Sequence, residues 1–145
     1  MAFIYAILIL LIISGIGTIT YIIYYNALQD CKVKIDEAES MIDEALRSKY
    51  DILLKLESLI KTNIKETKIN FKDLNDLKKE SISNFQLERK LVDTVLLINK
   101  IQDDFPELEE IKDYRELLND IRVMDERINA AKKYYNKYTS KSNEL

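Results

Sequence analysis

Residues 2–25 read AFIYAILILLIISGIGTITYIIYY, and the first charged side chain of the sequence is Asp30. As a helix rising about 1.5 Å per residue, this apolar segment would be roughly 36 Å long, enough to cross a hydrocarbon core about 30 Å thick. We therefore expect a transmembrane anchor over residues 1–25, followed by one domain over residues 26–145.

Three tyrosines lie at the end of the apolar segment that is nearer to the charged part of the chain: Tyr21, Tyr24 and Tyr25. Such amphipathic rings favour the membrane–water interface, which is where we expect these residues. Ser14 and Thr18 form a small-xxx-small pair that could let two anchors approach, although a plain lipid-facing helix is the simpler interpretation.

Two other N-terminal signals match the sequence less well. A cleaved signal peptide carries a basic n-region, a shorter apolar core and a small-residue exit, whereas here no Lys or Arg precedes the core and the exit is Tyr24-Tyr25-Asn26. A lipoprotein signal ending at Cys31 would need small residues where Gln29 and Asp30 stand. We therefore expect an uncleaved, single-pass protein of the cell membrane.

The orientation of the chain is predicted from the basic residues beside the anchor. Lys32 and Lys34 follow it closely, while the other side offers only the α-amino group. Because basic residues are enriched in cytoplasmic loops, this small excess favours the cytoplasmic side for the domain.

The composition of the domain favours long helices. Both glycines of the chain lie in the anchor, and the one proline is Pro106. β-Rich and α/β folds need turns that usually recruit Gly and Pro. The formal net charge of −3 gives no basic surface of the kind that binds nucleic acid, so no nucleic-acid partner is expected.

A heptad-like seam of apolar residues starts directly after the anchor. Its members are Leu28, Cys31, Ile35, Ala38, Ile42, Ala45, Ile52, Leu56 and Leu59. Lys49 is the one interruption, and Leu46, Tyr50 and Leu53 widen the stripe toward one face of a bundle. Because no residue between Tyr25 and Leu59 breaks a helix, we expect anchor and seam to form one continuous helix.

Further helices are predicted after a corner near residues 62–71. A short amphipathic piece contains Phe71, Leu74 and Leu77. Ser83 is expected to cap the next helix, with Gln86 as the other member of a capping box. That helix should end at Phe105-Pro106, since a residue before proline avoids the α region.

The last helix is predicted from a second capping box that starts at Asp113, although its first turn could begin as early as Pro106. Its seam residues recur every three or four positions and are Tyr114, Leu117, Ile121, Met124, Ile128, Ala131, Tyr135 and Tyr138. The predicted fold class is all-α: a transmembrane helix that continues into an antiparallel up-and-down bundle of three long helices and one short one.

Catalytic chemistry finds little support in the sequence. The chain has no His, the commonest general base and zinc ligand, so we expect no enzyme, no cofactor and no metal centre. Cys31 lies on the seam and is expected to be a packing residue. Five carboxylates between Asp103 and Glu110 could attract a cation, but they lack the spacing of a calcium loop, so a solvated corner is favoured.

Two blocks of sequence resemble the LemA family of bacterial single-pass membrane proteins. The first block comprises Tyr25-Asn26-Ala27-Leu28, Glu37-Ala38, Ile42-Asp43, Leu46 and Tyr50-Asp51, similar to the family patterns YN-x-L, EA and ID-x-x-L. The second comprises Phe105-Pro106-Glu107-Leu108, Tyr114-x-x-Leu117, Arg127-Ile128, Ala131 and Tyr134-Tyr135-Asn136, similar to YP-[DE]-L, F-x-x-L, RI-x-x-A-R and FYN. The resemblance implies a membrane helix with an up-and-down bundle. It also implies a membrane partner, because some members are associated with membrane zinc metallopeptidases or with TPM-domain proteins.

These observations favour a non-catalytic, membrane-tethered scaffold that binds a membrane or membrane-proximal protein, with a second copy of the chain as one such partner. An accessory factor for a membrane zinc metallopeptidase or a TPM-domain protein is the alternative. In either case the lipid bilayer is the expected surroundings of residues 2–25.

Overall fold

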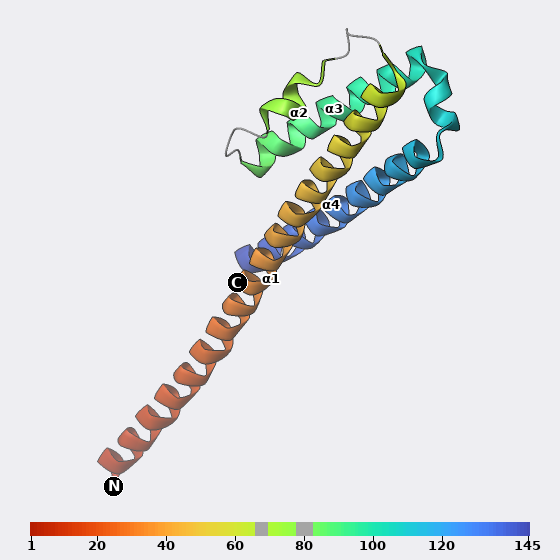
Figure 1. Ribbon diagram of the computed structural model, residues 1–145. Coiled ribbons are helices and arrows are strands. Elements are labelled where there is room, and N and C mark those ends of the chain that lie inside the picture. The colour runs from red at the N-terminus through yellow and green to blue at the C-terminus, as the bar shows by residue number, and fades with distance from the viewer. Residues whose placement is uncertain (66–69, 78–82) are drawn as a thin grey trace. The chain divides into compact units, whose positions relative to one another are not determined.

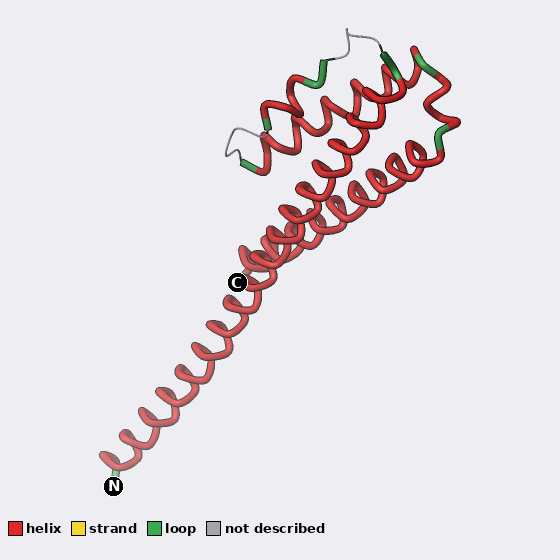
Figure 2. The backbone as a smooth tube through the Cα atoms, in the orientation of Figure 1, coloured by secondary structure: helices red, strands yellow, loops and turns green. Residues whose placement is uncertain are grey.

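Residues 1–65, 70–77 and 83–145 are described by a computed structural model, and every regular element in these ranges is helical (Figures 1 and 2). The elements are α1 (Ala2–Asn63), α2 (Lys72–Asp76), α3 (Asn84–Asp104), the 3₁₀ helix η1 (Pro106–Glu110) and α4 (Lys112–Glu144). The predicted all-α class is confirmed, and α1 packs with α3 and α4 in a bundle-like fold.

The chain divides into two compact units. One contains Met1–Glu39 and Lys133–Leu145, and the other contains Ser40–Lys132. The helices α1 and α4 each contribute residues to both units.

The first helix is 62 residues long, and its sequence explains that length. It contains no proline, and both of its glycines lie in the apolar segment, so no strong helix breaker interrupts the helix after Gly17. Its end at Asn63 agrees with the predicted corner, where the side-chain amide of Asn63 donates to the Leu59 carbonyl at 2.8 Å. The rest of that corner, residues 66–69, lies outside the described part of the chain.

The ends of α3 also follow the sequence signals. The Oγ atom of Ser83 accepts a hydrogen bond from the backbone N–H of Gln86 at 3.4 Å, so Ser83 is the predicted N-cap. At the other end the backbone turns at Phe105, and Pro106 starts η1, where its missing N–H costs nothing.

The start of α4 differs from the predicted box at Asp113. The backbone N–H of Arg115 donates to the carbonyl of Ile111 at 3.2 Å, so the helix begins at Lys112 and Asp113 lies within its first turn. The carboxylate therefore does not cap the helix, although in the first turn it still interacts favourably with the helix dipole.

The core of unit Ser40–Lys132 is apolar and draws on every element. Its largest fully buried side chains are Leu46, Leu53, Leu56, Ile60, Phe71, Leu74, Leu91, Ile98, Leu108 and Tyr114. Each aliphatic side chain buried in this way contributes about 1.5–3 kcal/mol as an upper estimate. The short helix α2 is held through the flanking Phe71 and its own Leu74, which confirms the predicted amphipathic piece.

Two side-chain contacts fix the direction of α4 relative to α3. The Tyr114 hydroxyl donates to Oε1 of Gln102 at 2.9 Å, near the corner between the two helices. At the opposite ends, Lys132 of α4 pairs with Glu88 of α3. The two helices are therefore antiparallel, as a short connection between neighbours requires.

Tyr114 also fastens the corner that precedes α4. Its hydroxyl is bonded to Gln102, and the amide of Gln102 in turn donates to the carboxylate of Glu109 in η1. Burial, with a smaller contribution from the charge of Glu109, raises the pKa of Tyr114 to about 12. The hydroxyl thus stays protonated and able to donate throughout the physiological range.

In the other unit, residues 2–26 are exposed on every side, whereas Cys31, Ala38 and Tyr138 are buried. Lys34 joins α1 to α4 here by donating to the Tyr138 hydroxyl at 3.2 Å.

Two tyrosine-to-phenylalanine substitutions should affect stability differently. Tyr114→Phe removes a buried hydroxyl that donates to Gln102, so we expect the free energy of unfolding to fall by about 1 kcal/mol. Tyr50→Phe removes a buried hydroxyl that has no partner among the described residues, so stability should be unchanged or higher. Urea unfolding of the detergent-solubilised chain, followed by circular dichroism, measures the free energy of unfolding of both variants. Equal losses would contradict the view that only the Tyr114 hydroxyl makes a stabilising hydrogen bond.

Candidate functional site

The side chains that could hold a metal ion do not gather at one place in the described part of the chain. Within residues 1–65, 70–77 and 83–145, no three His, Cys, Asp or Glu side chains are grouped so as to hold a metal ion. The five carboxylates of the acidic corner are exposed: Asp103, Asp104, Glu107, Glu109 and Glu110. Cys31, the one cysteine, is completely buried.

The predicted interface residues lie on the surface of α1. Tyr21, Tyr24 and Tyr25 are exposed, and the rings of Tyr21 and Tyr25 stack with their centroids 6.2 Å apart. By length and composition, α1 is the one helix among the described residues that could cross a membrane, and an N-terminal signal sequence has the same properties.

The predicted seam residues all avoid full exposure. Those that are buried are Cys31, Ala38, Ala45, Leu56, Tyr114, Ile121, Ile128, Ala131 and Tyr138. Those that are half-buried are Leu28, Ile35, Ile42, Ile52, Leu59, Leu117, Met124 and Tyr135.

The most deeply buried face of α1 drifts away from the heptad seam along the helix. Leu53 and Ile60 are fully buried, while the seam residues Ile52 and Leu59 lie at the edge of the core. A straight helix has about 3.6 residues per turn, so a strict repeat of 3.5 rotates off its buried face by about 20° per heptad. Between Leu28 and Ile60 this rotation adds up to about one residue position, so the buried face shifts from Ile52 and Leu59 to Leu53 and Ile60.

The residues of the family-like motifs occupy several kinds of position. Leu46 is fully buried, and Asp43 is half-buried, where it accepts a hydrogen bond from Arg47 at 2.9 Å. Phe105 is half-buried at the end of α3. The exposed motif residues are Tyr25, Asn26, Asp51, Pro106, Arg127 and Asn136.

Lys49, the interruption of the seam, is a buried cation that joins α1 to α4. Its ammonium group lies 2.6 Å from Oδ1 of Asp125, with 5% of the lysine side chain and 45% of the aspartate side chain exposed. The sequence signals a gap in the seam at this position, but the partner is 76 residues away and sequence spacing does not identify it.

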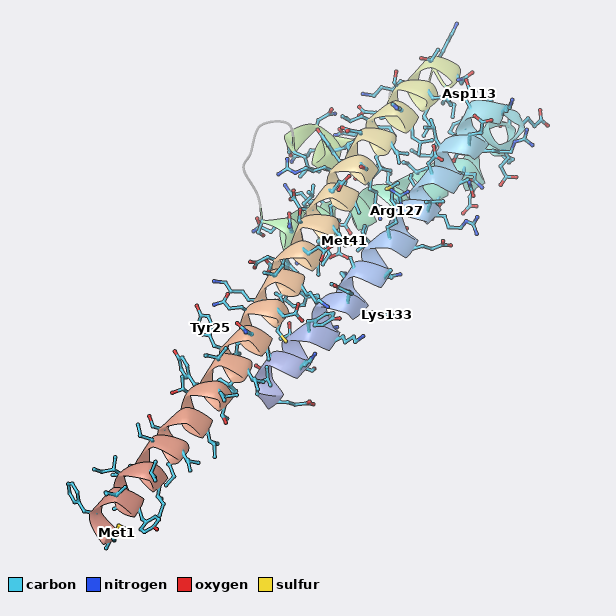
Figure 3. All side chains as sticks on the ribbon, turned by 90° about the horizontal axis from the view of Figure 1, so that it is seen from below. Met1, Tyr25, Met41, Asp113, Arg127 and Lys133 are labelled. Carbon is cyan, nitrogen blue, oxygen red and sulfur yellow. The ribbon has the colours of Figure 1, made fainter. Side chains whose placement is uncertain are left out.

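A groove of about 290 Å³ lies between α1 and α4 in the unit Ser40–Lys132. Its walls are Met41, Glu44, Ala45 and Ser48 from α1, and Met124, Arg127 and Ala130 from α4. Figure 3 shows Met41 and Arg127 on these two neighbouring helices. We name these seven residues the α1–α4 groove.

A second hollow, of about 440 Å³, is lined by residues of α4 alone, among them Lys112 and Glu116, which form an ion pair at 3.7 Å. One helix supplies no opposite wall, so this hollow is an open surface rather than a binding site.

Tyr138 lies among lysines in the unit that contains the N-terminus. The ammonium groups of Lys34, Lys137 and Lys141 lie 4.7, 5.4 and 5.9 Å from the centre of its ring. The hydrogen bond from Lys34, followed by the charges of Lys137 and Lys141, lowers the pKa of Tyr138. Sequence reasoning placed Tyr138 on the seam but missed these lysines.

The fold defines a helical protein with one long apolar N-terminal helix that could cross a membrane. Comparisons with protein-family models, with curated proteins and with solved structures find no match.

Removing Asp125 should destabilise the fold more than removing the charge of Lys49. Asp125→Ala leaves a buried ammonium group without its counter-charge, which should cost about 1–3 kcal/mol of unfolding free energy. Lys49→Met removes the charge and keeps the volume, so its stability should stay within about 1 kcal/mol of the original. Chemical unfolding of both variants measures the difference, and a larger loss for Lys49→Met would contradict the account.

Proposed function

We propose that this protein is a non-catalytic, membrane-tethered helical scaffold that binds another protein. The observation that carries the proposal is the division of α1. Its apolar N-terminal part is exposed on every side and free of charge, while its later part packs against α3 and α4. An exposed apolar helix of this length is costly in water and stable in a bilayer.

The proposed architecture is a single transmembrane helix over residues 2–25 that continues into an antiparallel up-and-down bundle. The stacked pair Tyr21 and Tyr25 would lie at the lipid headgroups, as amphipathic rings prefer. Lys32 and Lys34 support a cytoplasmic position for the bundle.

The proposed family is LemA, on the strength of the two sequence blocks that resemble its patterns. This assignment rests on those motifs alone, since no family model matches. Within this proposal, a membrane zinc metallopeptidase or a TPM-domain protein is the alternative partner, and the protein would then act as its accessory factor.

Tethering explains how a scaffold that offers helix faces to its partner could bind usefully. Confinement beside the membrane raises the effective concentration of two tethered partners, so a contact that is weak in solution becomes substantially occupied. The surfaces available for such contacts are helix faces, which bind partner helices through apolar and small side chains.

The membrane tether is tested by charge in the apolar segment. Leu11→Lys with Ile12→Lys should release the chain from membranes, because each lysine near the centre of a span costs about 3 kcal/mol. The matched control is Val92→Lys with Leu96→Lys, two exposed positions on α3. Alkaline carbonate extraction should then leave the original chain and the control in the pellet.

Intact mass measurement of the membrane-bound chain completes this test. The proposal expects residues 1–25 to be retained. A chain that has lost them and leaves the membrane would identify a cleaved signal sequence instead, and the tether would be refuted.

A further inference from the structure

The α1–α4 groove has two walls that run in opposite directions, since Lys49 of α1 meets Asp125 of α4 and Met41 lines the same groove as Ala130. One turn along α1 corresponds to one turn back along α4. Met41 therefore stands level with Ala130, and Glu44 with Arg127.

A third level follows in the same register, with Ser48 on α1 and Met124 on α4. From one end of the groove to the other, the side chains of the α1 wall are large at Met41, negatively charged at Glu44 and small at Ser48. At the same three levels, the side chains of the α4 wall are small at Ala130, positively charged at Arg127 and large at Met124.

The two charged side chains of the groove, Glu44 and Arg127, have no ion-pair partner among the described residues of their own chain. Glu44 and Arg127 are both exposed, and neither side chain has an ion-pair or hydrogen-bond partner in the described ranges. The neighbouring charges on the same helices differ in this respect, because Arg47 pairs with Asp43 and Arg122 with Glu126.

We propose that the α1–α4 groove is the interface of a homodimer, occupied by the same groove of a second copy of this chain. A two-fold axis running along the groove keeps each level at its height and exchanges the walls, so α1 of one copy faces α4 of the other. Glu44 then meets Arg127 of the second copy, and by symmetry Arg127 of the first copy meets Glu44 of the second.

The apolar levels complement each other under the same symmetry. Met41 meets Ala130 of the second copy, and Ser48 meets Met124 of the second copy, so a long side chain faces a short one at both levels. Methionine is unbranched and polarisable and adapts to an irregular surface. A foreign helix would need a matching pattern of size and charge, whereas a second copy has it by symmetry.

This inference rests on the proposed membrane tether, which makes a small interface sufficient. Two copies in one membrane share a thin layer and encounter each other at high effective concentration. The groove alone need not supply the affinity of a soluble dimer.

The test is chemical crosslinking in membranes between two full-length forms that carry tags of different size. Both carry Cys31→Ala; one also carries Met41→Cys and the other Ala130→Cys, so a short bismaleimide can produce a mixed band only between chains. The control replaces Ala130→Cys by Val92→Cys, an exposed position on α3 outside the groove. We expect the mixed band with Ala130→Cys and none with Val92→Cys.

Charge reversal makes the test specific. Glu44→Arg and Arg127→Glu, each alone, should lower the mixed crosslink by at least about tenfold, because each places like charges opposite one another twice, and the double reversal should restore it. Asp93→Arg and Arg89→Glu, exposed on α3, should leave it unchanged. Circular dichroism confirms folding of each variant. If a reversal unfolds the chain, the mixed band between the Met41→Cys and Ala130→Cys forms without any charge reversal decides.

The outcomes separate the two proposals. A chain that remains in carbonate-washed membranes but gives no mixed band refutes the dimer and leaves the tether standing. A band that survives both single reversals, or a crosslink from Ala130→Cys to a different protein, also refutes it. A chain absent from the membrane fraction refutes the tether itself.

Discussion

Every other element of this protein depends on the uninterrupted backbone hydrogen bonding of α1. The helix holds its apolar segment and its amphipathic segment in one run of 62 residues without a proline. In a helix of this kind the angular position of each residue follows from its number. The spacing of seven residues between Leu46, Leu53 and Ile60 therefore places these three buried side chains close to one face of α1.

The remaining elements bury their apolar faces around α1 and one another. The core of unit Ser40–Lys132 takes side chains from α1, α3 and α4, and the short elements α2 and η1 add Leu74 and Leu108. Polar contacts then fix direction rather than supply most of the stability. Tyr114 fastens the corner before α4, and the pair of Lys49 and Asp125 joins α1 to α4 within the apolar contact.

Local signals were sufficient to predict the helices α1, α2, α3 and α4, but not the separate 3₁₀ helix η1. Ser83 caps α3 because a hydroxyl at that position satisfies a free N–H, and Phe105-Pro106 ends the helix because of backbone geometry. The start of α4 was misplaced because Asp113 matches a capping pattern that implies Tyr114 as the first helical residue, whereas the helix begins two residues earlier, at Lys112. The seam was displaced at Ile52 and Leu59 because the straight helix departs from a heptad.

Features that depend on residues distant in sequence could not be predicted. Lys49 looked like a fault in an apolar pattern, and Asp125 gave no sign of being its partner. The same holds for the α1–α4 groove, because Glu44 and Arg127 are unremarkable surface charges until the fold places them on facing walls. Sequence patterns specify which face of a helix is buried, and tertiary packing decides what the exposed faces offer to a partner.

The central claim is that the apolar segment and the bundle helix are one α-helix. A nitroxide scan from Ile19 to Glu39 in lipid vesicles tests it directly, with accessibility to a lipid-soluble and a water-soluble relaxant measured at each position. One helix predicts lipid accessibility on all faces before Tyr25, and then protection at Cys31 and Ala38 in a 3.6-residue period with no change of phase. A phase break or a non-helical stretch between Tyr24 and Leu28 would contradict the account.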